Sequence, residues 1–352
     1  MISSRPNYLR KRCRTAMVIL VLSTSFRALP QALPIGVTSD RGHRTVTITV
    51  DGAAFTTFIY PDTLEKPVLY PIYAPDGQLI TRGFPIAPRP GEPVDHPHHL
   101  GLWFDYENVN GLDFWNNSYA IAAGKKSQYG WIRTDSILQA GNGTLKYSAR
   151  WTDQKQNVLL TELTTYVFSA TRAERVIDRY TTLRANIDVN FPDAKDGVLG
   201  LRVTKELQIP SGTPGEFVDD KGNITKVAAG NTPDINGTYL TSEGKKGDSA
   251  WGTRGTWCLL YGKKENDTLS IALIDHPGNP GYPTYWHARG YGLFAANPLG
   301  QKIFSNGKQV LGYRLEKGQS VTFRYRIVIA AGNESLSTGR IRQLADAFAH
   351  IK

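Results

Sequence analysis

The sequence predicts an all-β protein, built as one large antiparallel β-sandwich with a short C-terminal helix. Three observations lead to this prediction. Aromatic residues make up 11% of the 352 residues, and glycine and proline number 34 and 20, a mix typical of strands joined by turns. Short runs in which apolar and polar residues alternate recur past residue 40. Helical periodicity is clear only at the C-terminus.

The predicted strands follow one another with turn signals between them. Each run combines β-branched residues with a period of two, which is the pattern of a strand with one buried face. The runs are 44–50, 53–60, 67–74, 159–170, 175–189, 199–209, 256–262, 268–275 and 321–332. Asp-Gly or Asn-Gly pairs start at residues 51, 76, 110, 236 and 306, and GNG starts at 141, so we expect tight turns there.

One helix is predicted, from a cap at Ser335 or Ser337 through the segment TGRIRQLADAFAHIK. Its apolar positions share one helical face and are Ile341, Leu344, Ala345 and Phe348. Segment 210–248 is rich in Gly, Asn, Thr, Asp and Lys and is expected to be a long loop or an excursion from a sheet. Because helices are missing between the strands, we expect two packed sheets in a single domain, residues 33–352.

The first 32 residues are predicted to be a signal peptide. They hold six basic residues and no acid, and the apolar run Ala16–Phe26 is too short to span a bilayer. A basic, membrane-anchored tail is the alternative. We expect the rest of the chain to be periplasmic or secreted, without a transmembrane segment. The net charge of +10 falls to +4 without those six residues, and no basic stripe indicates a nucleic-acid partner.

Residues 95–115, DHPHHLGLWFDYENVNGLDFW, hold three of the seven histidines. In an extended segment His96 and His98 would share one face, and His99 would point to the other. Two imidazoles on one face can bind a metal or exchange protons with a substrate. Nearby acids, Asp95 and Asp105, could orient them. Two indoles, Trp103 and Trp115, either stack on a sugar ring or belong to the core.

A second stretch, residues 274–300, holds the next two histidines, His276 and His287. Both stretches contain the tripeptide DHP, and together they hold five of the seven histidines. We infer that the stretches meet in space and form one pocket, although the second pair could serve only as hydrogen-bond partners of the loop. The neighbouring candidates are Asp275 as an orienting acid, Trp286 as a sugar-stacking ring and Arg289 as a substrate-binding cation.

Two further substrate-binding candidates come from outside these stretches. Arg82 could hold a hydroxyl or a carboxylate of a substrate. In the run 200–209, the side chains of Arg202, Thr204 and Glu206 would alternate onto one face. That polar row predicts either a concave binding surface or a solvated outer face of the sheet.

At these motifs the sequence resembles the secreted bacterial proteins labelled "PmoA family" or "methane oxygenase PmoA". The matching segments are Tyr70–Arg82, Asp95–Phe104, Val109–Trp115 and Asp275–Pro298; Leu100 stands where many relatives have Arg. The resemblance implies a link to sugar catabolism and a fold similar to the β-sandwich of galactose mutarotases, which use a His and a carboxylate without a cofactor. No mutarotase catalytic residue can be matched by motif. The chain lacks the membrane spans of a true methane monooxygenase subunit.

The leading hypothesis is therefore an exported carbohydrate-active enzyme, an epimerase, lyase or hydrolase. Its general acid and base would come from the histidines named above, oriented by Asp95, Asp105 or Asp275. It needs no cofactor, but a divalent metal such as Zn²⁺ on His96, His98 and His287 is an open variant. The alternatives are a non-catalytic glycan-binding module that uses the tryptophans and a purely structural envelope protein. The expected partner is a small molecule or an oligosaccharide.

Overall fold

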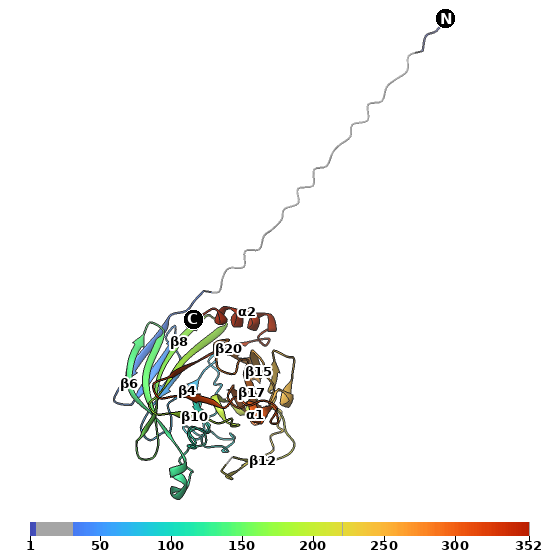
Figure 1. The fold of residues 1–352 in the computed structure, drawn as a ribbon. Helices are drawn as coiled ribbons and strands as arrows, with labels where there is room; N and C mark the ends of the chain where they lie inside the picture. The colour runs from blue at the N-terminus through green and yellow to red at the C-terminus, as the bar shows by residue number, and fades with distance from the viewer. Residues whose placement is uncertain (5–30, 220, 352) are drawn as a thin grey trace. The chain divides into compact units, whose positions relative to one another are not determined.

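The computed structural model describes residues 1–4, 31–219 and 221–351 (Figure 1). The chain divides into two units, residues 1–30 and 31–352, and every strand and helix of the described residues belongs to the second. Most of the predicted signal peptide lies outside the described residues, so both it and the domain boundary after it stay predictions. No helix of the described part of the chain is long and apolar enough to cross a membrane.

Two eight-stranded antiparallel sheets form the body of the second unit. The first sheet consists, in spatial order, of β1 (Ile35–Asp40), β2 (Thr45–Val50), β3 (Ala53–Ile59), β4 (Val68–Ile72), β5 (Leu102–Tyr106), β11 (Gly197–Arg202), β18 (Leu293–Asn297) and β17 (Tyr285–Arg289). The second consists of β14 (Thr238–Thr241), β15 (Trp257–Lys264), β16 (Asp267–Asp275), β20 (Ser320–Gly332), β9 (Glu174–Ala185), β8 (Val158–Ala170), β7 (Thr144–Thr152) and β6 (Trp131–Gly141). The predicted all-β sandwich is confirmed.

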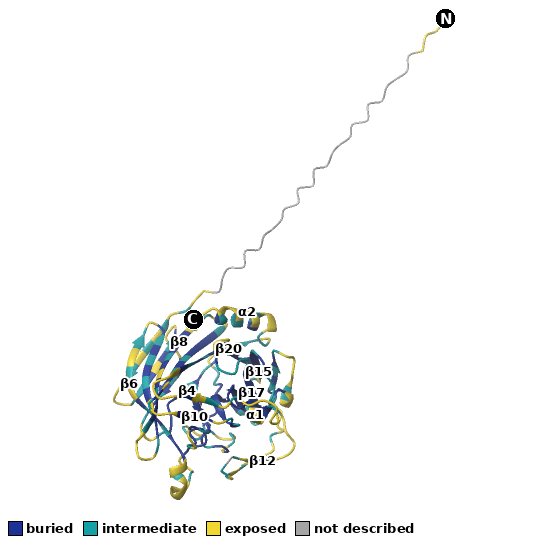
Figure 2. Ribbon diagram, in the orientation of Figure 1, coloured by how far each residue is buried: buried dark blue, intermediate teal, exposed yellow. Residues whose placement is uncertain are grey.

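The main hydrophobic core lies between the two sheets. Alternate side chains of β2 and β5 enter it from the first sheet, among them Ile48 and Phe104. Phe323 and Ile327 of β20 enter it from the second sheet. In Figure 2 strands in the middle of the molecule, such as β17, are mostly buried, and many of the loops are exposed. Burying each such side chain stabilises the fold by about 1.5–3 kcal/mol, so the period-two alternation of the sequence fixes which face of each strand points inward.

Tight turns join neighbouring strands where the sequence predicts them. Asp51 and Gly52, between β2 and β3, have φ angles of 48° and 80°. Asn142 and Gly143, between β6 and β7, have φ angles of 48° and 69°. Two successive positive φ values define the hairpin turn whose twist matches that of the strands, and Asp, Asn and Gly adopt them at low cost.

Helix α2 (Thr338–Ala349) covers part of the outer face of the second sheet. The side chain of Ser337 caps it by accepting a hydrogen bond from the amide of Arg340 at 3.1 Å. Its apolar face buries Ile341 and Phe348 against Trp257 of β15 and other residues of that sheet. The predicted helix and its cap are thus confirmed. The other helical turns are short: α1 (Gln301–Phe304), η1 (Ala123–Gln128), η2 (Lys205–Leu207) and η3 (Gly247–Ala250).

One expectation about residues 199–248 is wrong. The predicted strand 199–209 ends at Arg202, because the amide of Thr204 bonds to Ile80 O and the chain then enters η2. Glu206 therefore does not continue a row begun by Arg202. Of the two alternatives for segment 210–248, the excursion from a sheet describes it: the segment contains the separate two-stranded hairpin of β12 (Gly215–Val218) and β13 (Ile224–Val227), followed by β14 of the second sheet. A second small pair joins β10 (Val189–Phe191) to β19 (Tyr313–Leu315).

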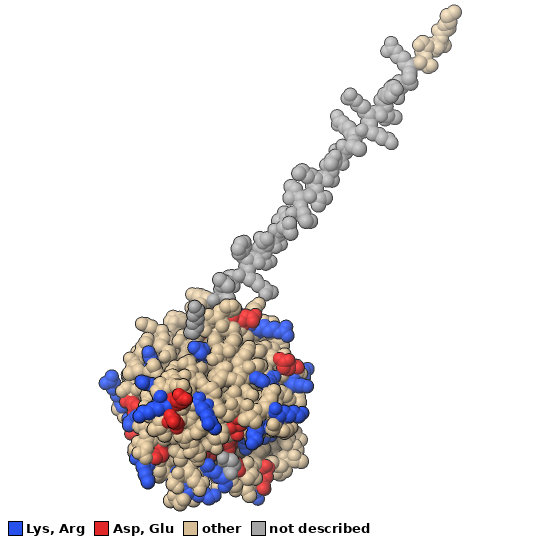
Figure 3. Space-filling view, in the orientation of Figure 1, with Lys and Arg blue, Asp and Glu red and all other residues tan. Residues whose placement is uncertain are grey.

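Charged side chains of both signs are interspersed on the face of the molecule shown in Figure 3. Several form surface pairs, such as Arg150 with Asp135 at 2.7 Å and Arg340 with Glu174 at 2.7 Å. Exposed pairs of this kind contribute at most about 1 kcal/mol each, so the stability of the fold comes mainly from the core.

Candidate active site

A cavity of about 300 Å³ lies on the outer face of the first sheet, away from the main core. Strand β17 shows how the sequence selects this face. Trp286 and Ala288 point into the main core, so His287 and Arg289, which alternate with them, point outward and line the cavity.

The sheet beneath the cavity carries small residues at its centre. Gly200 of β11 pairs with Trp103 of β5 on one side and with Ala295 of β18 on the other, and Ala295 pairs with His287. These four residues form one row across the sheet. A Cβ atom at Gly200 would lie 2.4 Å from the ring of Trp103 and 2.7 Å from that of Trp115. Glycine therefore leaves the space that both indoles fill, and they form a fully buried floor.

A buried ion pair supports this floor. Nζ of Lys66 lies 2.5 Å from Oδ2 of Asp105 and donates a hydrogen bond to Trp115 O at 2.7 Å. Burial raises the pKa of Asp105 to about 6, although Lys66 acts in the opposite direction. Asp105 was expected to orient a histidine, but its carboxylate is engaged by Lys66 and it does not line the cavity.

Residues 95–99 form a turn and not the expected extended segment. His96 has a φ of 43°, in the left-handed region, and the amide of His99 bonds back to His96 O at 3.0 Å. As a result His96, His98 and His99 all line the cavity, although His99 was expected to point elsewhere. A non-glycine residue with positive φ is held there by its surroundings, and such positions concentrate at functional sites.

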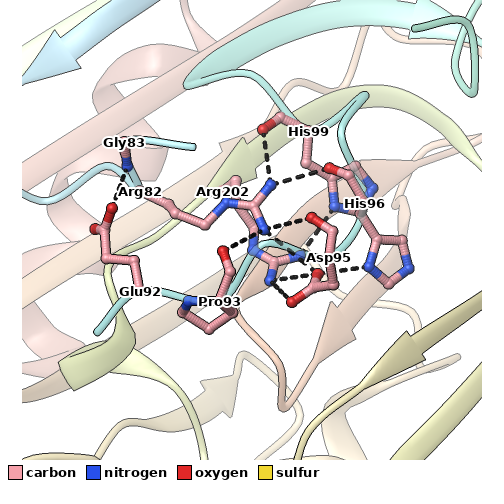
Figure 4. Close-up of polar contacts among 8 residues, drawn as sticks. All are labelled: Arg82, Gly83, Glu92, Pro93, Asp95, His96, His99 and Arg202. Carbon is pink, nitrogen blue, oxygen red and sulfur yellow. Dashed lines mark hydrogen bonds and ion pairs between the residues drawn. The ribbon is translucent and has the colours of Figure 1, made fainter. Parts of the chain in front are cut away.

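Arg82 provides those surroundings by binding the carbonyl groups of the turn (Figure 4). Its Nη1 donates to Asp95 O at 2.7 Å, and its Nη2 donates to His96 O at 3.0 Å and to His99 O at 3.3 Å. Arg82 is almost completely buried and does not line the cavity. It therefore positions the histidine turn and does not contact a substrate in the cavity.

Asp95 connects this turn to the first sheet. Its carboxylate lies 2.7 Å from Nη2 of Arg202 and 2.6 Å from Nδ1 of His96 (Figure 4). Burial acts to raise the pKa of Asp95, but Arg202, His96 and Arg82 together lower it. Asp95 is thus held as a carboxylate, which can only accept hydrogen bonds. The proton of neutral His96 therefore lies on Nδ1, and Nε2 is the nitrogen with a lone pair.

His99 has the opposite tautomer. Its Nδ1 lies 3.1 Å from Nη1 of Arg202, and because a guanidinium only donates, Nδ1 must be unprotonated. Its ring is stacked on Trp103 at 5.2 Å between centroids and on His96 at 4.7 Å. Burial, with its cationic neighbours, lowers the pKa of His99 well below the usual value. His99 therefore stays neutral at physiological pH.

His98 lies edge-on to its two neighbours, with its ring centroid 4.4 Å from that of His99 and 5.5 Å from that of His96. Its ring nitrogens have no hydrogen-bond partner among the residues that the structure describes. Burial lowers the pKa of His98 well below the usual value. The ring is thus a neutral, uncommitted proton donor and acceptor on the cavity wall.

A second His–Asp pair lies across the sheet on β17. Nε of Arg289 donates to Nε2 of His287 at 3.3 Å, so the proton of His287 lies on Nδ1. That Nδ1 is 3.3 Å from Oδ1 of Asp196, but the two atoms do not form a hydrogen bond. Burial, with Arg289 and Lys195, lowers the pKa of His287, and burial raises the pKa of Asp196. The sequence analysis did not single out Asp196, because nothing in its spacing links it to His287.

The hairpin of β12 and β13 forms one wall of the cavity. Phe217 of the hairpin lies against Tyr291, with their ring centroids 4.6 Å apart, and Tyr291 stacks on His96 at 4.7 Å. The remaining lining combines apolar residues such as Ile121, Val218 and Ile224 with polar ones, which include Asn116, Ser118, Lys125, Lys195, Asp219, Asn223 and Thr225. The cavity thus combines aromatic surfaces with many hydrogen-bonding groups.

Other predicted site residues lie elsewhere. Asp275 accepts hydrogen bonds from Asn279 Nδ2 at 2.7 Å and Thr284 N at 2.8 Å, which hold the irregular loop. His276 bonds through Nε2 to Ile351 O at 3.0 Å and packs edge-on against Phe348. Glu206 lies 3.8 Å from Lys264, away from the cavity.

The tryptophans belong to the core, which is one of the two alternatives for Trp103 and Trp115, and do not form a sugar platform. Trp103, Trp115 and Trp286 are all fully buried, the first two in the floor and Trp286 in the main core. The glycan-binding hypothesis relied on exposed indoles, so it loses that support. The aromatic residues that do face the cavity are Phe217 and Tyr291.

The predicted metal variant has no support from the geometry. Within the described residues, no group of three or more His, Cys, Asp or Glu side chains is arranged to hold a metal ion. Of the three suggested ligands, His287 has Nε2 occupied by the hydrogen bond from Arg289 and a proton on Nδ1, so it offers no lone pair.

The protein is thus a two-sheet β-sandwich that carries neighbouring His and Asp side chains in a cavity on the outer face of one sheet. The chain belongs to DUF6807, a family of unknown function, whose profile matches residues 45–346. No curated protein sequence matches the chain.

Solved structures give distant likenesses. The GH36 α-galactosidase AgaB from Geobacillus stearothermophilus is 10% identical, with a TM-score of 0.36 over 85% of this chain and 41% of its own. A galactose mutarotase related enzyme from Lactobacillus acidophilus is 8% identical, with a TM-score of 0.34 over 86% of this chain and 100% of its own. This chain therefore spans less than half the length of the α-galactosidase.

Proposed function

We propose that this protein is an enzyme that acts on a small carbohydrate by general acid–base catalysis in the cavity described above. The observation that carries the proposal is the pair of His96 and Asp95. The carboxylate is held ionised by two arginines, it fixes the proton of the imidazole on Nδ1, and the basic Nε2 is left on a residue that lines the cavity. This is the arrangement that a general base requires.

In the proposed reaction, Nε2 of His96 removes a proton from the substrate and becomes an imidazolium. Asp95, 2.6 Å from Nδ1, stabilises that positive charge. The His96 imidazolium then returns this proton to another substrate atom, while the neutral ring of His98, on the same cavity, can hydrogen-bond to a substrate oxygen. Epimerisation, elimination and hydrolysis all consist of one such removal and one such delivery.

The lining of the cavity supports a polyhydroxylated substrate. Amide, hydroxyl and charged groups around the cavity can bond to hydroxyls, and Tyr291 and Phe217 offer apolar faces for the C–H side of a sugar ring. The cavity volume of about 300 Å³ is at the lower end of ligand pockets, which favours one or two sugar units. The motif resemblance to the PmoA-labelled proteins, with their link to sugar catabolism, supports the same class. Export from the cytoplasm, based on the basic and apolar N-terminus, is part of the proposal.

The test is a screen of the purified chain from residue 31 onward against sugars and keto-sugars, with and without a chelator. The matched variant is His96→Asn, because Asn keeps a donor near Asp95, lacks a basic nitrogen and tolerates the φ of 43°. We expect turnover of at least one sugar by the parent protein and a loss of about 10²- to 10⁴-fold in His96→Asn. Sugar binding without turnover in both proteins would instead identify a binding module.

A further inference from the structure

Arg289 lies at the boundary between the cavity of the candidate active site and a second cavity of about 200 Å³. Phe217, Arg289 and Tyr291 line both cavities, so these three side chains form the partition between them. The second cavity is lined on its other sides by residues that include Gln208, Ser211 and Asp248. A group bound at Arg289 can therefore be reached from both cavities.

The orientation of the guanidinium is fixed on three sides. Nε donates to Nε2 of His287 at 3.3 Å. The guanidinium carbon lies 4.3 Å from the ring centroid of Trp251 and 5.6 Å from that of Phe217. Because stacking and the Nε hydrogen bond hold the plane, the two terminal nitrogens are presented in a defined direction.

Those two terminal nitrogens have no acceptor among the described residues. Five other arginines differ in this respect, because each of them reaches a carboxylate within 4.0 Å: Arg82, Arg179, Arg202, Arg326 and Arg340. A fixed guanidinium with two unused donors is a bidentate site for a planar anion.

The side-chain amide of Gln208 offers a further, uncharged hydrogen-bond donor in the second cavity. Gln208 is 6% exposed, lines that cavity, and its Nε2 has no hydrogen-bond partner in the part of the chain that the structure describes. Leaving a buried amide donor unsatisfied is unfavourable, so a ligand oxygen in this cavity would gain from bonding to it.

We propose that Arg289 binds the carboxylate of an acidic sugar, such as a uronic acid, whose ring occupies the larger cavity beside His96. This inference rests on the proposed function and specifies its substrate class. The charges around Arg289 favour a carboxylate over a phosphate. Asp196 and Asp248 also line these cavities, and the nearby Lys195 is 3.4 Å from Asp196. The single guanidinium charge of Arg289 balances the one negative charge of a carboxylate. It would not balance the two charges of a phosphate, which Asp196 and Asp248 would also repel.

The experiment measures binding by calorimetry to the purified chain from residue 31 onward. The probes are glucuronate, galacturonate, glucose, galactose and glucose 6-phosphate. The variants are Arg289→Gln, which removes the charge, and Arg289→Lys, which keeps the charge but not the planar fork. The control is Arg342→Gln, at an exposed position of α2. Thermal unfolding of each protein checks that it is folded.

We expect a uronate to bind more tightly than the neutral sugars and glucose 6-phosphate. Arg289→Gln should weaken uronate binding about 10- to 100-fold, Arg289→Lys should weaken it less, and Arg342→Gln should leave it unchanged. Equal affinity for uronates and neutral sugars, tighter binding of the phosphate, or no uronate binding at all would each overturn the inference.

His96→Asn separates this inference from the proposed function. If the uronate binds through Arg289 and His96→Asn leaves turnover intact, the catalytic proposal fails and the anion site stands. If only neutral sugars are turned over, in a manner that needs His96 but not Arg289, the catalytic proposal stands and the anion site fails.

Discussion

Arg202 of β11 and Asp95 of the histidine turn form a buried ion pair, with Nη2 and Oδ1 2.7 Å apart. The same guanidinium donates from Nη1 to Nδ1 of His99. One arginine on a rigid strand thus sets the ionisation of Asp95 and the tautomer of His99, and through Asp95 it also sets the tautomer of His96. The chemistry of the turn is therefore fixed by the sheet beneath it.

Arg202→Gln should shift the pH dependence of turnover. Burial and Arg202 together hold the pKa of His96 at about 4, so the neutral base is present above that pH and lost as the pH falls through it. Without Arg202 the pKa of His96 rises, and the acid limb of kcat/KM should move to higher pH. The measurement is the pH profile of kcat/KM, with Arg342→Gln as the control. An acid limb at the same pH in both variants would contradict this role.

Substitutions of His96 should separate backbone strain from chemistry. Asn accepts a φ of 43° readily, so His96→Asn adds no backbone strain and should cost about 1–2 kcal/mol, for the lost ring stacking on His99 and Tyr291. Val is β-branched and resists this φ, so His96→Val should cost about 1–3 kcal/mol more than His96→Asn. Urea unfolding measures both. Equal stability of the two variants would show that the left-handed turn is not held in solution.

His98→Gln should make the free energy of unfolding fall less steeply as the pH is lowered below 6.5. The pKa of His98 is lowered on folding, so its neutral form stabilises the fold above pH 6.5, and that contribution is lost as the pH falls. Asp105 and Asp275 act in the opposite sense, because burial raises their pKa values to about 6 and about 7. Asp105 and Asp275 are present in both proteins. The difference in the free energy of unfolding between His98→Gln and the parent therefore reports the contribution of His98 alone.

Below pH 6.5 the variant should gain up to about 1.4 kcal/mol per pH unit relative to the parent. The measurement is urea unfolding between pH 7.5 and 5. His43→Gln, at an exposed histidine whose pKa is raised by Asp40, should change the slope in the opposite direction. Parallel curves for His98→Gln and the parent would mean that the pKa of His98 is the same in the folded and unfolded states.

Gly200→Ala should destabilise the floor of the cavity. The added methyl group would lie 2.4 Å from the Trp103 ring and 2.7 Å from the Trp115 ring, so both indoles would have to move. We expect a loss of about 1–3 kcal/mol in the free energy of unfolding and a change in tryptophan fluorescence. Gly124→Ala is the control, because its Cβ would meet no atom within 4 Å.

A separate buried network lies in the main core, where Arg179 Nη2 donates to Oε1 of Glu162 at 3.0 Å. Tyr147 and Trp151 also donate to this carboxylate, each at 2.8 Å. Arg179→Met should cost about 3–5 kcal/mol, because it leaves a buried charge without its partner. The exposed pair of Arg150 and Asp135 offers the contrast, since Arg150→Met should cost less than about 1 kcal/mol by the same denaturant titration.

The sequence predicted several strands that have one buried face, although it missed β1, β6 and β7, which also alternate. Strands β2, β8 and β20 alternate clearly, and their bounds agree closely with the predicted runs. Strands β17 and β18 were not predicted, because nearly every residue in them is buried and no alternation remains. Both faces of the first sheet are covered at that point, one by the main core and one by the cavity residues.

The site was predicted in part. The density of histidines indicated that His96, His98, His99 and His287 lie together, and the structure brings all four to one cavity. Asp196 was missed, because strand pairing and not sequence spacing brings it to His287. The roles of the tryptophans were open for a physical reason: an indole suits a buried floor and a sugar platform equally well.

Strands β12 and β13 pair only with each other among the described strands, yet their residues form one side of the cavity that holds the histidines. Neither large sheet needs this hairpin to complete its ladder. Exchanging or lengthening it would therefore reshape what the protein can admit while the scaffold and the proton-transfer groups stay in place. Relatives that share the scaffold can thus diverge in ligand preference through a segment of a dozen or so residues, and the same segment is the natural target for library-based redesign.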